Sequence, residues 1–173
     1  MTAARYALFE TALGFCAIAW TERGVVRTFL PEPSAAEIRA RLRRRLPNAQ
    51  EADPQGDVRR AIDGIVRLMA GERVDLTWIS LVDDGVPELD RRVYALARAI
   101  EPGSTLTYGD IARRLGDVAL SRTVGEALGR NPFPIVVPCH RVLAAGGRTG
   151  GFSARGGTET KMLLLRVEGA VLL

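Results

Sequence analysis

The segment NPFPIVVPCHRV, residues 131–142, decides how this chain is interpreted. Its three prolines stiffen it, because each proline fixes its own φ and biases the preceding residue away from helix. We therefore expect an extended, strand-like lead that delivers Cys139 and His140. His140 is the only histidine in the chain, and Cys139 is one of two cysteines. This pattern predicts a nucleophilic thiol held in a defined place.

A cysteine beside a histidine has two interpretations. A free thiol has a pKa of about 8.5 and needs a base to become a good nucleophile, and His140 is the only imidazole available. Neighbours in an extended segment point to opposite sides, so His140 is expected to reach Cys139 through a turn or a water. It then needs an orienting group, for which Glu168 is a candidate. Taken alone, the pair also fits a coincidence without chemistry.

Composition narrows the classes of protein. A hydrophobic share of 47% supports a folded core, and no apolar run approaches the roughly 18 residues of a membrane span. The N-terminus lacks the pattern of a secretory signal. Two cysteines do not make a disulfide framework, so we expect a cytoplasmic protein with reduced thiols. One histidine and two cysteines argue against a four-ligand zinc site, so we expect no metal and no cofactor.

The net charge of +4 lies entirely in the second half of the chain. Residues 1–86 carry twelve arginines and twelve acidic residues, whereas residues 87–173 carry twelve basic and eight acidic ones. A basic half indicates a polyanionic partner, although ordinary solvated arginines explain the charge equally well.

The first part of the chain, residues 1–84, predicts a small α/β scaffold domain. Its short apolar segments predict an antiparallel meander, and its later apolar residues recur at helical spacing. The expected strands are residues 5–11, 14–21, 24–30 and 74–79, and the expected helices run from the cap at Ser34 to Pro47 and over residues 57–69, with a polar loop at 48–55 between them. Cys16 is expected to be a buried small hydrophobe. The arginine run at 39–45 fits a phosphate backbone, but we favour a solvated helix face.

An acidic linker with glycine and proline, residues 83–87, separates this part from a second domain, residues 87–173. Two short helices around a tight glycine turn predict a helix-turn-helix, a pattern that many helical pairs share. The expected elements are helices at 88–100, 107–116, 120–128 and 158–167 and a strand at 142–145, followed by a glycine-rich loop at 145–157. Met162, Leu163 and Leu165 are expected on the inner face of the last helix. The fold class is α+β with two domains: a small antiparallel sheet with helices, then a mostly helical domain.

The helix at 120–128 carries small residues at two-residue intervals, Ser121, Thr123 and Gly125, around one long side chain, Arg122. Small residues allow a helix to approach another surface closely. They fit either close contact with a partner or ordinary helix packing, with Arg122 in water.

The motif at 138–142, together with Asn131, Tyr108 and Arg122, resembles the O6-alkylguanine-DNA alkyltransferases, also called methylated-DNA–protein-cysteine methyltransferases. The resemblance is close over residues 87–170 and loose over residues 1–86. It implies a protein that acts once, moving a methyl or other alkyl group from the guanine O6 atom, or thymine O4, of duplex DNA onto Cys139.

The resemblance also implies a role for each matching residue of the reaction centre. Cys139 accepts the alkyl group, His140 is its water-linked base and Glu168 orients that histidine. Asn131 supports the active-site turn. Tyr108 contacts the flipped base and helps to protonate the leaving guanine.

Further matching positions concern base and DNA recognition. Arg122 enters the duplex in place of the extruded nucleotide, on a minor-groove helix whose Ser121, Thr123 and Gly125 permit close approach. The carbonyls of Cys139 and Val142 and the N–H of Ser153 hydrogen-bond the guanine edge. Arg141 is grouped with the DNA contacts, although its expected main role is to hold the segment in place. Phe152 departs from the family, in which many members have tyrosine.

The expected partner is double-stranded DNA that carries alkylated guanine, bound by a monomer at the bacterial nucleoid, with no membrane involved. Two other functions remain to be tested. One is a relative that flags damaged bases without reacting, although such relatives lack the cysteine. The other is a cysteine hydrolase that uses Cys139 and His140.

Overall fold

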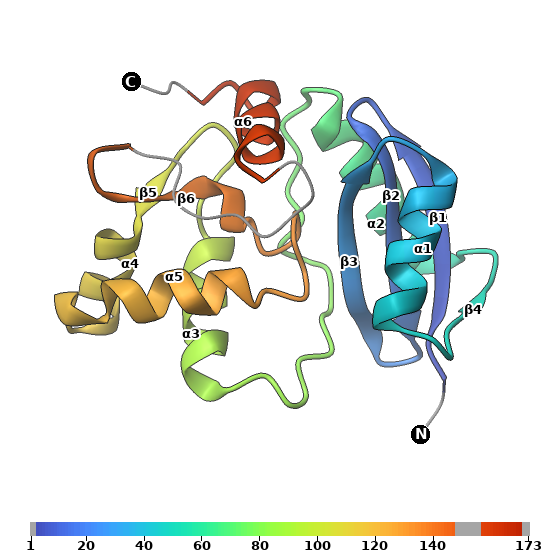
Figure 1. Cartoon of the computed structure of the whole chain (residues 1–173), viewed down its shortest axis with the longest axis horizontal. Coiled ribbons are helices and arrows are strands. Elements are labelled where there is room, and N and C mark those ends of the chain that lie inside the picture. Colours follow the sequence, from blue (N-terminus) through green and yellow to red (C-terminus); the bar gives the residue numbers. More distant parts are fainter. Residues whose placement is uncertain (1–2, 148–156, 171–173) are drawn as a thin grey trace. The chain divides into compact units, whose positions relative to one another are not determined.

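The computed structural model describes residues 3–147 and 157–170 (Figure 1). The chain divides into two compact units, Met1–Val82 and Asp83–Leu173. The domain limits expected from the sequence, 1–84 and 87–173, remain a prediction, because they concern independent folding. No helix within the described ranges is long and apolar enough to cross a membrane.

The first unit is a four-stranded sheet in the order β3-β2-β1-β4. β1 (Arg5–Thr11), β2 (Gly14–Thr21) and β3 (Gly24–Glu32) form the expected antiparallel meander. The turns are tight because Gly14 and Gly24 adopt positive φ, and a Cβ at either position would lie 2.6–2.7 Å from a backbone carbonyl oxygen. β4 (Gln50–Glu51) pairs parallel with β1 inside the segment expected to be a loop.

Two helices complete the first unit, α1 (Ala35–Arg45) and α2 (Gly56–Met69). Ile38 and Leu42 of α1 share a buried cluster with Ala17 and Ala19 of β2. Cys16, which points to the other face of β2 because side chains alternate along a strand, contacts Met69 of α2. Both faces of β2 are therefore covered, as its continuous apolar run requires.

The strand expected at 74–79 is wrong. This segment is irregular within the structure, because the Asp75 carboxylate accepts hydrogen bonds from the backbone N–H and the hydroxyl of Thr77 and forms a local turn. An isolated parallel bridge between Val25 and Leu81 lies two residues after the end of this segment.

The second unit is mostly helical, as expected. Its helices are α3 (Glu88–Arg98), α4 (Tyr108–Leu115), α5 (Ser121–Gly129) and α6 (Thr158–Val167), with 3₁₀ turns at Val118–Leu120, Cys139–Arg141 and Ala145–Gly147. A short parallel pair, β5 (Leu106–Thr107) and β6 (Val142–Leu143), joins the start of α4 to the segment after the cysteine. The predicted mixed α+β class is confirmed.

The helix-turn-helix forms where it was predicted. Thr107 caps α4, with reciprocal hydrogen bonds between its side chain and Asp110 N–H and between Asp110 and Thr107 N–H. Gly116 ends α4 at a φ of 102°, in the left-handed region. α3 supports the pair, because the Tyr94 hydroxyl donates to the Ala127 carbonyl of α5 at 2.7 Å.

The inner face of α6 differs from the prediction. Leu165 is buried as expected, but Leu163 is 42% exposed. Lys161 and Leu164 share the buried face instead, at the i, i+3, i+4 spacing of a helix stripe.

Candidate active site

The lead to the cysteine is a tight turn rather than the strand-like segment expected. Val137 N–H donates to the Phe133 carbonyl at 2.8 Å, and Pro134 and Val137 form an isolated bridge. Ile135, at the tip, has a φ of 78° although it is not glycine. Three prolines restrict their own φ angles, but they do not prevent the residues between them from turning.

Asn131 holds this turn together. Its side-chain N–H donates to the Val137 carbonyl at 2.9 Å, and its Oδ1 accepts from Phe133 N–H at 2.8 Å. The side chain also lies within hydrogen-bonding reach of the Cys139 thiol. One amide therefore fixes both ends of the turn and favours the anionic form of the Cys139 thiol.

Cys139 begins a 3₁₀ turn that continues through His140 and Arg141, and all three residues are buried. The Cys139 carbonyl accepts the Val142 N–H, which closes the turn. Adjacent side chains in such a turn diverge by about a third of a revolution instead of pointing to opposite sides.

Glu168, the C-cap of α6, collects the side chains that follow the cysteine. Its carboxylate accepts from His140 Nε2 at 3.0 Å and from Arg141 through Nε at 3.0 Å and Nη2 at 2.6 Å. Arg141 Nη1 donates to the Ile100 carbonyl at 2.6 Å. The structure thus brings together the histidine and the acid that sequence reasoning could only pair as candidates.

The charges of this cluster follow from its contacts. Burial alone would raise the pKa of Glu168, but hydrogen bonds from His140 and Arg141 outweigh it and lower that pKa from 4.5 to about 2. Glu168 is therefore an anion at neutral pH. Burial lowers the pKa of His140, although Glu168 partly opposes the shift, so the imidazole is neutral.

A neutral His140 beside a carboxylate has a defined tautomer. Nε2 carries the proton, because it donates to Glu168. Nδ1 then holds a lone pair, and this atom is buried without a hydrogen-bond partner among the described residues. A buried imidazole with a free lone pair is equipped to accept a proton.

Cys139 is 7% exposed, and this burial raises the pKa of its thiol. Three influences act against burial: the Asn131 side chain, the positive charge of Lys161 and the backbone N–H groups of the turn. Each of them stabilises negative charge on sulfur. The surroundings therefore favour a thiolate when a base removes the proton.

Lys161 is the functional residue that sequence reasoning missed. Its Nζ donates to the Val142 carbonyl at 2.8 Å and lies 5.9 Å from the centre of the Tyr108 ring. Burial lowers its pKa from 10.5 to about 8, although the Cys139 sulfur raises it. Two signals were available: it is the only lysine in the chain, and it shares a helix stripe with Leu164, Leu165 and Glu168.

Tyr108, the first residue of α4, lies between this lysine and α5. Burial, and then the nearby Cys139, raise the pKa of its phenol. A Cβ at Gly125 of α5 would lie 3.6 Å from the Tyr108 ring. Tyr108 is therefore a neutral hydroxyl that is placed by packing against α5.

Comparisons with known proteins agree on one family. The model of the 6-O-methylguanine DNA methyltransferase DNA-binding domain matches residues 88–170. A methylated-DNA–protein-cysteine methyltransferase of Methanosarcina acetivorans is 32% identical over 166 residues, 95% of this chain and 98% of the relative. The chain belongs to the methylated-DNA–protein-cysteine methyltransferases.

Other members of the family extend this likeness. The enzyme of the same name from Methanothermobacter thermautotrophicus is 38% identical over 124 residues, 72% of this chain and 68% of the relative. The crystal structure of Mycobacterium tuberculosis OGT in complex with DNA is 29% identical, with a TM-score of 0.73 over 95% of this chain and 92% of that one. The predicted family and its two-part fold are confirmed.

The structure gathers most of the predicted reaction-centre residues around one thiol. The members of this group within the second unit are Tyr108, Asn131, Cys139, His140, Val142 and Glu168. Arg122 lies outside the group, on the exposed side of α5, where its side chain is 93% exposed and 3.4 Å from Glu126. Ser153 and Phe152 lie outside the described residues.

The structure shows where the predicted DNA contacts Arg141 and the small residues of α5 lie. Arg141 is 5% exposed and bound to Glu168 and Ile100, so it is a structural anchor and no surface contact. Ser121, Thr123 and Gly125 do not form one face of α5, because two residues span about 200° of an α-helix. Ser121 and Gly125 share the flank beside α4, and Thr123 lies on the other side.

No cluster of three or more histidine, cysteine or acidic residues suited to a metal ion occurs in the described part of the chain.

Proposed function

We propose that this protein repairs DNA by direct reversal, transferring a methyl or other small alkyl group from guanine O6 to the sulfur of Cys139. The observation that carries the proposal is a buried thiol followed directly in the chain by a neutral imidazole, which is itself bound by a buried carboxylate. Family membership supplies the reaction class.

The first step is loss of the thiol proton. His140 Nδ1 holds the lone pair that accepts it, through a bridging water, and Glu168 stabilises the imidazolium that forms. The Asn131 amide and the Lys161 ammonium stabilise the sulfur anion left behind.

The second step is an in-line displacement. The sulfur forms a bond to the alkyl carbon while the bond from that carbon to guanine O6 breaks, and the electron pair goes to the base. The leaving guanine takes up one proton, which balances the proton lost by the thiol. Because a thioether is stable to water at neutral pH, no step regenerates Cys139 and each molecule acts once.

Base recognition falls to the groups around the sulfur. The Val142 carbonyl already accepts from Lys161, but a carbonyl oxygen has a second lone pair that can accept from the guanine edge. The Tyr108 hydroxyl, neutral and next to Lys161, is suited to donate a hydrogen bond to the base as negative charge develops there. Ser153 N–H is proposed as a further contact on the resemblance alone.

The reaction requires access to a base that lies inside a duplex. Such a base must be rotated out at a cost of a few kcal/mol, and an inserted side chain offsets the lost stacking. Arg122 is long, exposed and the projecting residue of α5, which suits it for insertion from the minor groove. Ser121 and Thr123, the residues before and after it in the chain, have small side chains that leave Arg122 as the long one at this position.

We further propose that double-stranded DNA with alkylated guanine is the partner, as the DNA complex of the M. tuberculosis relative supports. One chain carries every group named above, so a monomer suffices. A repair protein of this kind works on the chromosome, which in a bacterium is the cytoplasmic nucleoid.

The decisive experiment mixes the protein with a duplex that contains one O6-methylguanine and weighs the peptide that carries Cys139. We expect one added methyl group per molecule and no further turnover. An unmodified Cys139 peptide would disprove alkyl transfer and favour a protein that only marks damaged bases. Repeated turnover on a small ester would instead favour a cysteine hydrolase.

A second experiment tests Arg122. Arg122→Ala should slow repair of duplex DNA by about 100-fold and leave the reaction with a free O6-alkylguanine largely unchanged, since insertion offsets a few kcal/mol only in a duplex. Equal losses on both substrates would remove Arg122 from the flipping role.

A further inference from the structure

The first unit carries a positive edge that has no role in the chemistry above. α1 bears five arginines, and an α-helix turns about 100° per residue. Arg41, Arg44 and Arg45 therefore fall within an arc of about 100° on one flank, and Arg39 and Arg43 fall on the other. Ion pairs show which strand each flank faces. Arg41 binds Glu32 of β3 at 3.2 Å, and Arg39 binds Glu51 of β4 at 2.9 Å.

β3 adds a fourth guanidinium to the first flank. Arg27 lies two residues before Phe29, which packs in the core under α1, and its guanidinium is 5.6 Å from the Phe29 ring. Burial, then the charges of Arg45 and Arg41, lower the pKa of Arg27. Its Nε is buried without a hydrogen-bond partner in the described part of the chain.

The carboxylates of this flank are already engaged. Glu32 pairs with Arg41, and Glu37, one turn earlier on α1, interacts with Ser34 at the helix cap. Arg27, Arg44 and Arg45 make no ion pair within the described ranges, so positive charge is left in excess. Arginines at i and i+4, such as Arg41 and Arg45, repel each other when nothing neutralises them. The fold tolerates this repulsion at one edge of a unit that carries twelve arginines and ten acidic residues.

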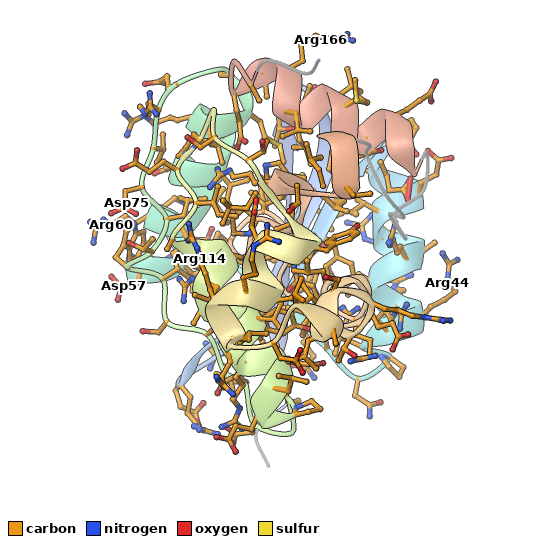
Figure 2. The ribbon with its side chains drawn as sticks, turned by 90° about the vertical axis from the view of Figure 1, so that its left-hand side faces the viewer. Arg44, Asp57, Arg60, Asp75, Arg114 and Arg166 are labelled. Atoms are coloured by element: carbon orange, nitrogen blue, oxygen red, sulfur yellow. The ribbon has the colours of Figure 1, made fainter. Side chains whose placement is uncertain are left out.

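The exposed members of the flank are available to a large partner. Figure 2 shows the Arg44 side chain extending from α1 away from the body of the unit. The planar guanidinium group of arginine matches phosphate oxygens in geometry as well as in charge. A row of guanidiniums along one helix flank fits a row of phosphates, whereas an isolated small anion needs only one or two of them.

We propose that Arg27, Arg41, Arg44 and Arg45 form a second DNA-contacting surface, in which the β3-side flank of α1 binds the phosphate backbone. The surface reads no sequence, because phosphate contacts position a protein without specifying bases. It adds affinity for any duplex, damaged or not, and so assists the search for rare lesions. The choice of DNA as the polyanion rests on the proposed function.

The test measures binding of an unmodified duplex of about 30 base pairs over a range of salt concentrations, since each phosphate contact contributes about 0.9 to the slope of log K against log salt. Arg44→Gln/Arg45→Gln removes two charges from the surface without breaking an ion pair of the described chain. The matched control, Arg43→Gln/Arg59→Gln, removes two charges from the opposite flank of α1 and from α2. We expect the first variant to lower the slope by about two and to weaken binding about tenfold near 0.1 M salt, with much smaller changes in the control.

Identical slopes for the two double variants would overturn the second surface. So would tighter binding of the wild-type protein to vesicles of anionic phospholipid than to the duplex, lost in the Arg44/Arg45 variant. The rate of alkyl transfer from a free O6-alkylguanine serves as the separate readout. If it stays normal while the slopes do not differ, the surface fails and the proposed function stands. If wild-type protein neither transfers the alkyl group nor binds the duplex, both fail.

Discussion

The two cysteines of this protein are both buried, and a comparison of their surroundings shows which groups favour a reactive thiol. Cys16 is fully buried in β2, and burial raises its pKa from 9.0 to about 12. Its sulfur lies 3.9 Å from the Met69 sulfur. Cys139 is also buried, and burial also raises its pKa, but an amide, an ammonium and backbone N–H groups oppose the shift.

The difference shows that burial alone does not distinguish a structural from a reactive cysteine. Burial excludes water in both places. Around Cys139 an amide, an ammonium and backbone N–H groups favour the anion, whereas the Thr11 side chain opposes the effect of burial at Cys16. The proposed base, His140, also donates to the Glu168 carboxylate. Reactivity is thus a property of the polar groups brought in from the 131–138 turn and from α6.

The largest expected effect separates the two thiols directly. Cys139→Ala should abolish alkyl transfer, because it removes the sulfur that is proposed to accept the alkyl group. Thiol labelling of the native wild-type protein followed by peptide mass analysis should modify Cys139 and spare Cys16. Labelling of Cys16 at the same rate would remove the basis of the comparison.

Loss of the carboxylate should be the next largest effect. Glu168→Gln should slow transfer by about 10²–10⁴-fold, since His140 loses the charge that stabilises its protonated form. It should also lower the free energy of unfolding at pH 7 by roughly 3 kcal/mol, because Arg141 is left buried without its partner. Stopped-flow repair assays and urea titrations measure the two changes.

The pH dependence of this variant gives a sharper signature. The pKa of Glu168 falls from 4.5 to about 2 on folding, so the unfolded chain binds the proton more readily. The stability that Glu168 contributes is complete above pH 4.5 and is lost as pH falls towards 2. Wild type and variant should therefore converge in acid. Glu126→Gln, which alters an exposed pair with Arg122, is the control and should change stability by no more than about 0.5 kcal/mol.

Replacement of Lys161 should slow alkyl transfer and raise the stability of the fold. Lys161→Met removes the ammonium that favours the thiolate, so transfer should slow by about tenfold. Stability should rise by about 1 kcal/mol, because a buried cation is replaced by an apolar chain of similar length, although the Val142 carbonyl loses its donor.

The buried charge of Lys161 costs stability, whereas that of Glu168 contributes stability, but folding lowers both pKa values and stability therefore rises with pH in both cases. Folding lowers the pKa of Lys161 from 10.5 to about 8, so the unfavourable burial of charge is complete below pH 8 and vanishes above pH 10.5. The stability advantage of Lys161→Met should thus shrink as pH rises between these values. A constant advantage would mean that folding does not change the pKa of the amine.

The smallest effect on the reaction should come from a change of Cys16, the thiol outside the candidate site. Cys16→Ser places a hydroxyl in an apolar contact with Met69 and should cost about 1–2 kcal/mol of stability. The rate of transfer to Cys139 should not change. A fall in rate without a fall in stability would show that Cys16 takes part in the chemistry.

Local signals in the sequence were sufficient for much of the fold. Gly14 and Gly24 mark turns through their own positive φ, and Thr107 and Asp110 mark a helix start through hydrogen bonds between residues three apart, so both signals are local. β4 escaped prediction because its two residues become a strand only by pairing with β1, about 45 residues away. The segment at 74–79 has strand-like residues, yet Asp75 turns it locally.

The candidate site likewise combines features that were visible in the sequence with contacts that only the folded chain shows. The cysteine and histidine were visible as neighbours, but the bond from His140 to Glu168 spans 28 residues and needs the folded chain. Lys161 was hidden because a basic residue is normally assumed to be solvated, and the helix stripe that would have placed it inside was assigned to Leu163.

The turn before the cysteine sets a constraint on redesign. Ile135 combines a φ of 78° with a side chain that is 1% exposed, so its backbone favours glycine while its surroundings require a bulky apolar group. Glycine would relieve the backbone and leave a hole, and a different branched residue would keep the strain. Attempts to shift the depth of the thiol for new alkyl groups should therefore vary Ile135 together with the core residues that it touches. A single substitution at this position either keeps the backbone strain or leaves a cavity.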